Sequence, residues 1–89
     1  MTLETLLAEQ REVQDAKDYV RANCDHLFRM RKEVCTQEQM ARVCGVSRMY
    51  IHLLESGRTN RIGKAALLRI VVQYKKLEEY RNGRNQGTA

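Results

Sequence analysis

Start and stop signals for two very short helices lie close together between Thr36 and Gly57. Thr36 and Gln39 have the spacing of a capping box, in which each side chain bonds the other residue's backbone amide. Gly45 can adopt the left-handed conformation that ends a helix. Ser47 is a suitable N-cap for the next helix, which Gly57 closes after only about nine residues. The segment therefore predicts two short helices joined by a tight glycine turn.

The side chains of this segment have the spacing of two helices that pack against each other. When Gln37 is counted as the first position, the small residue Ala41 is fifth and the turn residue Gly45 is ninth. Apolar residues occupy the fourth, eighth, tenth, fifteenth and eighteenth positions, namely Met40, Cys44, Val46, Ile51 and Leu54. This pattern is typical of a helix-turn-helix, whose second helix lies in the major groove of DNA.

Helices are also predicted elsewhere, because apolar residues recur in steps of three and four and the chain contains no proline. One stripe has eight positions, of which six are apolar and two, Gln10 and Lys17, are polar: Leu3, Leu6, Gln10, Val13, Lys17, Val20, Cys24 and Leu27. It predicts either one helix over residues 3–34 or, if Asn23 or Asp25 caps a new one, two helices over roughly 3–22 and 25–34. Another amphipathic helix is expected from Lys64 to about Asn82, with Gly83 as its stop.

We therefore expect an all-α fold, a compact bundle of about five helices that contains the helix-turn-helix, with an extra N-terminal helix. The expected organisation is an N-terminal helix over residues 1–24 that is a candidate dimerisation element, a DNA-binding domain over 25–82, and a flexible tail over 83–89. The tail sequence NGRNQGTA is polar and lacks an apolar anchor.

Charge is distributed unevenly along the chain, whose formal net charge is +5. Residues 1–28 carry three basic and six acidic side chains, whereas residues 29–89 carry thirteen basic and five acidic ones. Eleven of the sixteen cations are arginines, which suit bidentate contacts to phosphate and guanine. An acidic segment over residues 1–28 followed by a basic one over residues 29–89 indicates that the basic part binds a polyanion.

Several other classes of protein are disfavoured. Three cysteines, Cys24, Cys35 and Cys44, are an odd number that argues against a disulfide framework and for a reducing cytoplasm. Their spacing with His26 and His52 fits no standard zinc finger, so we expect no metal. No glycine-rich phosphate loop or nucleophile–base pair stands out, so we expect no enzyme, cofactor or small-molecule ligand. No apolar run is long enough to span a bilayer, so no membrane association is expected.

The segment from about Leu27 to Tyr74 resembles the phage repressor and Cro family of xenobiotic-response-element-type regulators. The resemblance lies in LFRMRKEVCTQEQMARVCGVSRMYIHLLESGR, which has the family's apolar–basic first helix, Thr-Gln-x-x-Met-Ala segment, Gly-Val-Ser turn and Ile-x-x-Leu-Glu-x-Gly ending. The chain departs from the family in the loop RTNRIG, which lacks the frequent proline, and in the residues before about Asp25, which have no counterpart in the minimal family domain.

The resemblance implies roles for individual residues. It places the base-reading face of the second helix on Ser47, Arg48, Met49, His52 and Leu53. Arg48 suits O6 and N7 of guanine, whereas Met49 and Leu53 suit thymine methyl groups. Phosphate contacts are implied for Gln37 at the start of the first motif helix, for Tyr50, and for the following loop with Arg58, Asn60, Arg61 and Lys64.

These features predict a cytoplasmic, sequence-specific DNA-binding transcriptional regulator, a dimeric repressor on a pseudo-palindromic operator of double-stranded DNA. Two alternatives are a DNA-binding antitoxin and a helix-turn-helix module that binds protein without binding DNA. The N-terminal stripe remains after the motif is assembled, and it either folds back on its own domain or pairs with a second copy in a homodimer.

Overall fold

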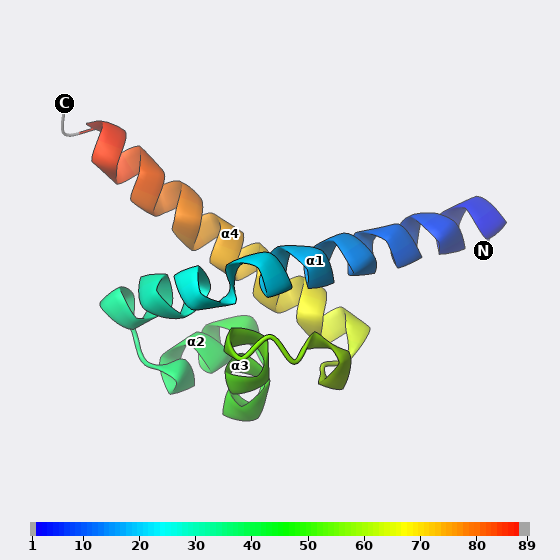
Figure 1. Ribbon diagram of the computed structural model, residues 1–89, viewed down its shortest axis with the longest axis horizontal. Coiled ribbons are helices and arrows are strands. Elements are labelled where there is room, and N and C mark those ends of the chain that lie inside the picture. Colours follow the sequence, from blue (N-terminus) through cyan, green and yellow to red (C-terminus); the bar gives the residue numbers. More distant parts are fainter. Residues whose placement is uncertain (1, 88–89) are drawn as a thin grey trace.

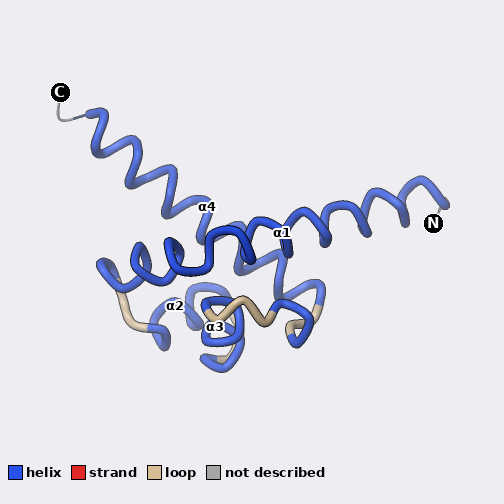
Figure 2. Tube along the Cα trace, viewed as in Figure 1, coloured by secondary structure: helices blue, strands red, loops and turns tan. Residues whose placement is uncertain are grey.

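The computed structural model describes the backbone of residues 2–87 and the side chains of residues 2–83. Figure 1 shows its elements, which are α1 (Leu3–Val34), α2 (Gln37–Cys44), α3 (Arg48–Glu55), the short 3-10 turn η1 (Thr59–Arg61) and α4 (Lys64–Gly87). All regular structure over residues 2–87 is helical (Figure 2), so the all-α prediction is confirmed. None of the helices in this range has both the length and the apolar character needed to cross a membrane.

The described residues form four α-helices and one 3-10 turn where about five helices were expected. The difference arises in α1, which is one uninterrupted helix of 32 residues. Asn23 does not cap a new helix there, because its side-chain amide donates to the carbonyl of Tyr19 one turn earlier at 2.8 Å. The helix therefore continues through the boundary expected near Asp25.

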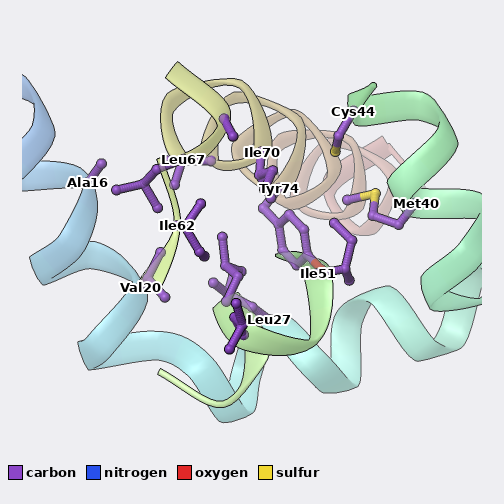
Figure 3. Packing of buried hydrophobic residues seen from close by; sticks show 14 of the residues in the cluster. Ala16, Val20, Leu27, Met40, Cys44, Ile51, Ile62, Leu67, Ile70 and Tyr74 are labelled. Carbon is purple, nitrogen blue, oxygen red and sulfur yellow. The ribbon is translucent and has the colours of Figure 1, made fainter. Parts of the chain in front are cut away.

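The two long helices cross near the middle of the molecule, and α2 and α3 pack on one side of them (Figure 1). The core lies where all four helices meet (Figure 3). Its fully buried members include Val20, Leu27, Ile51, Leu54, Leu67, Ile70 and Tyr74. The start of α1 and the end of α4 extend beyond this core in different directions, which gives the molecule its longest dimension of 47 Å.

The apolar stripe of α1 is divided between two environments. Val13, Val20 and Leu27 are buried in the core, so this part of the stripe folds back on its own domain. Leu3 and Leu6 precede the first buried residue and remain exposed. Folding back therefore accounts for only part of the predicted stripe.

The helix ends between Thr36 and Gly57 follow the predicted capping pattern. The amide of Gln39 donates to Thr36 Oγ1 at 3.1 Å, and the amide of Thr36 donates to Gln39 Oε1 at 2.9 Å. Gly45 and Gly57 have φ values of 71° and 77°, in the left-handed region that favours glycine. Ser47 occupies the N-cap position of α3, although its side chain makes no capping hydrogen bond.

Two expectations for the second half of the chain are wrong. Gly83 does not end α4, which continues to Gly87; nothing lies within 4 Å of the position that a Cβ of Gly83 would take, and glycine is tolerated inside a helix at modest cost. Of the predicted tail, residues 88–89 lie outside the described residues. The expectation of a flexible tail from residue 83 is wrong as well, because residues 83–87 continue α4.

Candidate nucleic-acid interface

The α2–turn–α3 unit holds α3 at the surface while burying one side of it. The turn is closed by the Val46 amide, which donates to the Ala41 carbonyl at 3.0 Å. Ala41 is buried where the two helices approach, as its small size predicted. Ile51 and Leu54 are completely buried and anchor α3 from behind. The opposite side of α3 is thereby fixed in orientation and open to solvent.

Most of the predicted base-contacting residues lie on this open side. Ser47, Arg48, Met49 and His52 are exposed, and Met49 is exposed to 61% although it is apolar. A shallow groove of about 400 Å³ is lined by Arg48, Met49 and His52 together with Gln37 from α2. The structure thus brings together an arginine fork, an imidazole, a thioether and an amide on one open surface.

Leu53 is the exception, because it is buried with 7% of its surface exposed. The expectation that it faces outward is wrong. The Arg58 amide donates to the Leu53 carbonyl at 2.9 Å, and this backbone bond ends α3 at the left-handed Gly57. Because α3 also packs against η1 and α1, it is covered on more sides than a two-helix motif alone implies. Tyr50, beside the exposed row, is half-buried against the core.

The residues expected to contact phosphate lie in two places. Gln37 is half-buried at the first position of α2, beside Arg48. Four others follow α3 along the chain and are all exposed. Arg58 directly precedes η1, Asn60 and Arg61 lie on η1, and Lys64 is the first residue of α4. Asn60 is held by α1, since its Oδ1 accepts from Arg21 Nη2 at 3.2 Å. The cations of this loop have no acidic partner among the ion pairs of the described residues.

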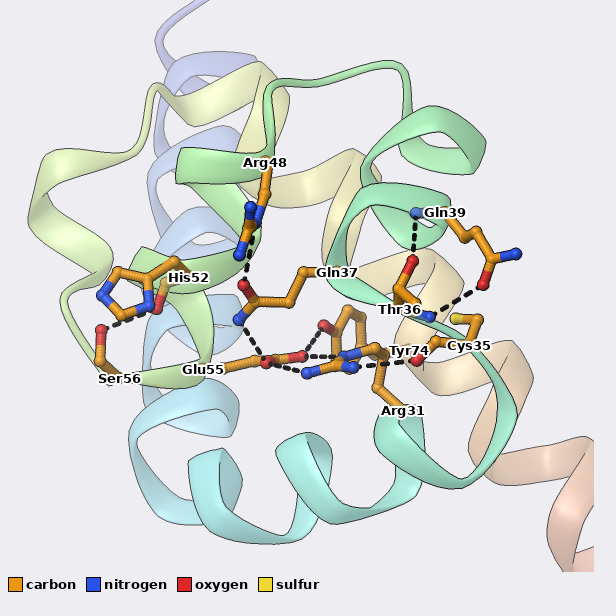
Figure 4. Close-up of polar contacts among 10 residues, drawn as sticks. All are labelled: Arg31, Cys35, Thr36, Gln37, Gln39, Arg48, His52, Glu55, Ser56 and Tyr74. Carbon is orange, nitrogen blue, oxygen red and sulfur yellow. Dashed lines mark hydrogen bonds and ion pairs between the residues drawn. The ribbon is translucent and has the colours of Figure 1, made fainter.

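A buried polar network lies directly behind the exposed row (Figure 4). The carboxylate of Glu55 accepts two hydrogen bonds from Arg31, from Nε and Nη2, both at 2.9 Å. It also accepts from the hydroxyl of Tyr74 and, at 3.1 Å, from Nε2 of Gln37. The other amide atom of Gln37, Oε1, accepts from Arg48 Nε at 3.5 Å. The network therefore connects the core to the predicted base-reading arginine.

The ionisation of this network follows from burial and pairing. Burial alone would raise the pKa of Glu55, but the hydrogen bonds from Arg31, Tyr74 and Gln37 outweigh it and hold that pKa below its ordinary value. The hydrogen bond to Glu55 raises the pKa of Arg31. Burial first, and then the Glu55 carboxylate, raise the pKa of Tyr74, which stays protonated and donates. Glu55 and Arg31 are thus both charged in the interior.

Sequence reasoning missed this network, although a signal was present. Arg31 lies four residues after Leu27 and so continues the apolar stripe of α1. Glu55 likewise lies four residues after Ile51 on α3. A cation and an anion at core positions of two helices predict a buried ion pair, because neither charge is stable there alone.

The surroundings of the histidines and cysteines offer no metal site. Within the part of the chain that the structure describes, no three His, Cys, Asp or Glu side chains lie close enough together to hold a metal ion. Cys44 is buried in the core, and burial raises the pKa of its thiol to about 11. The three thiols are free.

Comparison of the chain with protein-family models, with curated proteins and with solved structures finds no significant match.

Proposed function

We propose that the chain is a sequence-specific DNA-binding regulator of transcription that acts as a dimeric repressor, with α3 as its recognition helix. The observation that carries this proposal is the exposed row of Arg48, Met49 and His52 on a short helix that is anchored from behind. A helix is about 10–12 Å across with its side chains, and the major groove is about 12 Å wide. Two short helices joined by a left-handed glycine support a helix-turn-helix, and the likeness to the repressor and Cro family supports the same assignment.

Each exposed residue suits a distinct part of the duplex. The guanidinium of Arg48 can donate to both O6 and N7 of guanine, and the flexible apolar side chain of Met49 suits a thymine methyl group. His52 can donate to a base or to a phosphate. Arg58, Arg61 and Lys64 are cations without carboxylate partners, and phosphate contacts would satisfy them.

The buried network supports the role of Arg48. The Gln37 amide is held on one side by Glu55, so its Oε1 points toward Arg48 and limits where that guanidinium can go. A restrained arginine loses less conformational entropy when it binds. One α3 contacts only a few base pairs, too few to select a site in a genome, so two copies on a pseudo-palindrome are required.

The proposal is tested by selecting binding sites for the wild-type protein from random duplexes. We expect an inverted repeat with half-sites about one helical turn apart. Failure to enrich any sequence would refute sequence-specific binding.

Variants then assign the roles on the selected site. Arg48→Ala should relax the preference at one base pair of each half-site, by about 1–3 kcal/mol of discrimination. Arg61→Ala should weaken binding to all duplexes alike and reduce the slope of log affinity against log salt by up to about one. Lys76→Ala removes an exposed cation from the far half of α4 and is the matched control, expected to change neither quantity. Equal losses on specific and random DNA for Arg48→Ala would refute its role in reading bases.

A further inference from the structure

The side chain of Gln37 lies between a buried carboxylate and an exposed guanidinium (Figure 4). Its Nε2 donates to Glu55 Oε1 at 3.1 Å, and its Oε1 accepts from Arg48 Nε at 3.5 Å. Glu55 is buried, Gln37 is half-buried and Arg48 is exposed. The amide of Gln37 therefore spans the distance from the interior to the surface, and the two contacts occupy opposite ends of it.

The inner contact is held rigidly, because four hydrogen bonds surround the carboxylate of Glu55. Its Oε1 accepts from Arg31 Nη2 and from Gln37, and its Oε2 accepts from Arg31 Nε and from the hydroxyl of Tyr74. Arg31 and Tyr74 are both buried. Two donors on each oxygen leave this carboxylate no freedom to rotate. Gln37 thus meets acceptor atoms in a fixed position.

The orientation of the Gln37 amide follows from the chemistry of its inner partner. A charged carboxylate only accepts hydrogen bonds, so the amide must turn its NH2 group toward Glu55. The opposite orientation would place two acceptor oxygens against each other. The end of the amide that faces the surface is therefore Oε1, which accepts. A phosphate oxygen accepts as well, so this side chain is unsuited to the phosphate contact that the resemblance to the repressor and Cro family implies for Gln37.

The outer contact determines which donors of Arg48 remain for a ligand. The guanidinium is planar and carries five N–H donors, of which the one on Nε is taken by Gln37. Arg48 has no carboxylate partner among the ion pairs of the described residues. Its two Nη groups form a fork that matches O6 and N7 of guanine. Holding Nε therefore fixes the plane of this fork without using its donors.

We propose that Gln37 is a positioning residue that sets the base specificity of Arg48. Its side chain contacts no phosphate; it holds Nε of Arg48, and the two Nη groups of Arg48 read the base. The inference rests on the proposed function, since the reading of a base presupposes DNA binding. The hold on Nε is a property of the free protein, so the two proposals can fail separately.

The first test needs no DNA and measures how fast the Arg48 Nε–Hε proton exchanges with water, by NMR. The signal is assigned as the one that Arg48→Ala removes. Gln37→Met keeps the length of the side chain and deletes both polar ends, while Glu55 retains Arg31 and Tyr74. This variant should exchange the proton about two- to tenfold faster, as expected for the loss of one hydrogen bond.

The matched control for this test is Gln73→Met. Gln73 is a half-buried glutamine of α4 that lines a different groove, and its substitution should leave the exchange rate of Arg48 unchanged. Circular dichroism checks that both variants fold. If Gln37→Met does not fold, Gln37→Asn replaces it, because an amide one methylene shorter cannot reach both partners.

The second test is a double-mutant cycle on the duplex that the wild-type protein selects. Gln37→Met alone should weaken binding by about two- to tenfold. It should relax the base preference at the position that Arg48→Ala relaxes, and at no other position. In the Arg48→Ala background, Gln37→Met should change the affinity by less than about twofold, because a residue that acts only through Arg48 has nothing left to position.

Two results would overturn the proposal. An Arg48 exchange rate that Gln37→Met leaves unchanged would show that Gln37 does not hold Nε. An equal loss of affinity from Gln37→Met with and without Arg48 would show that Gln37 contacts the duplex directly. A wild-type protein that selects no duplex would refute the proposed function but not the hold on Nε, which the exchange rates decide by themselves.

Discussion

Replacing Arg31 by Met tests whether the buried network holds α3 in place. The substitution preserves most of the side-chain length but removes both hydrogen bonds to Glu55 and the one to the Cys35 carbonyl. The side chains of this pair are only 6% and 3% exposed, so water cannot replace the lost donors. Removing one partner of a buried ion pair costs about 3–5 kcal/mol, because the remaining charge is left uncompensated. We therefore expect Arg31→Met to lower the free energy of unfolding by about 3–5 kcal/mol.

The assay is urea unfolding followed by circular dichroism, at one protein concentration for all variants. For a domain of this size, each kcal/mol corresponds to about 4–8 °C in Tm, so heating should show the loss too. Arg81→Met is the matched control, because Arg81 pairs with Glu33 at 3.4 Å on the surface, where the side chains are 40% and 58% exposed. Its effect should stay below about 1 kcal/mol. A loss of less than about 1 kcal/mol for Arg31→Met would refute the reasoning.

The pH dependence adds a second readout. The pKa of Glu55 is lowered on folding, so its contribution to stability is present above the pKa of an unfolded glutamate, about 4.3, and is lost as the pH falls toward the folded pKa. Without Arg31, the largest remaining influence is burial, which raises the pKa of Glu55 and favours its protonation. The deficit of Arg31→Met relative to the wild type should therefore be largest near neutral pH and shrink below about pH 4–5. A deficit that stays constant across this range would argue against a charge effect.

Other substitutions test the turn and the two sides of α3. Gly45→Ala should destabilise the fold by about 1 kcal/mol or more, because φ is positive at that residue. Gly83→Ala should stabilise it by up to about 1 kcal/mol, because that helical position has space for a Cβ. Two variants with the same unfolding midpoint would contradict both expectations. Leu53→Ala should cost about 2–5 kcal/mol in the core, whereas exposed Met49→Ala should change stability by less than about 0.5 kcal/mol; the reverse order in urea would refute the placement of these side chains. Ala41→Leu should lower Tm by forcing α2 from its neighbours, and an unchanged Tm would show that this contact is loose.

Local signals in the sequence predicted the two ends of α2 well. A capping box and a left-handed glycine act within a few residues, so Thr36, Gln39 and Gly45 take their predicted geometry whatever packs around them. The end of α4 was not predicted, because the effect of a glycine depends on whether the chain around it continues as helix. Gly45 and Gly83 are the same residue type, and only one of them lies at a helix end.

The sequence could predict only those residues of the candidate site whose exposure follows from which face of α3 is buried. The spacing of α3 placed Arg48, Met49 and His52 outward, because two buried residues fix the opposite side. It could not place Leu53, because α3 packs against α1 and η1 as well as against α2, and these elements are distant in the sequence or follow the helix. It also left out Glu55, because a charged residue is assigned to the surface unless its partner, 24 positions earlier, is considered with it.

The stripe of α1 shows most clearly what periodicity cannot decide. Leu3 and Leu6 recur with the same steps of three and four as Val13 and Val20, so one pattern predicts one buried face. The structure buries the second pair and exposes the first. The difference comes from the neighbours, since α4 crosses α1 and covers its middle, while residues 3–12 extend past that crossing. A continuous stripe longer than the domain it packs against therefore has a buried part and an exposed part. The steps of three and four are the same in both parts, so only the positions of the neighbouring helices decide which part is covered.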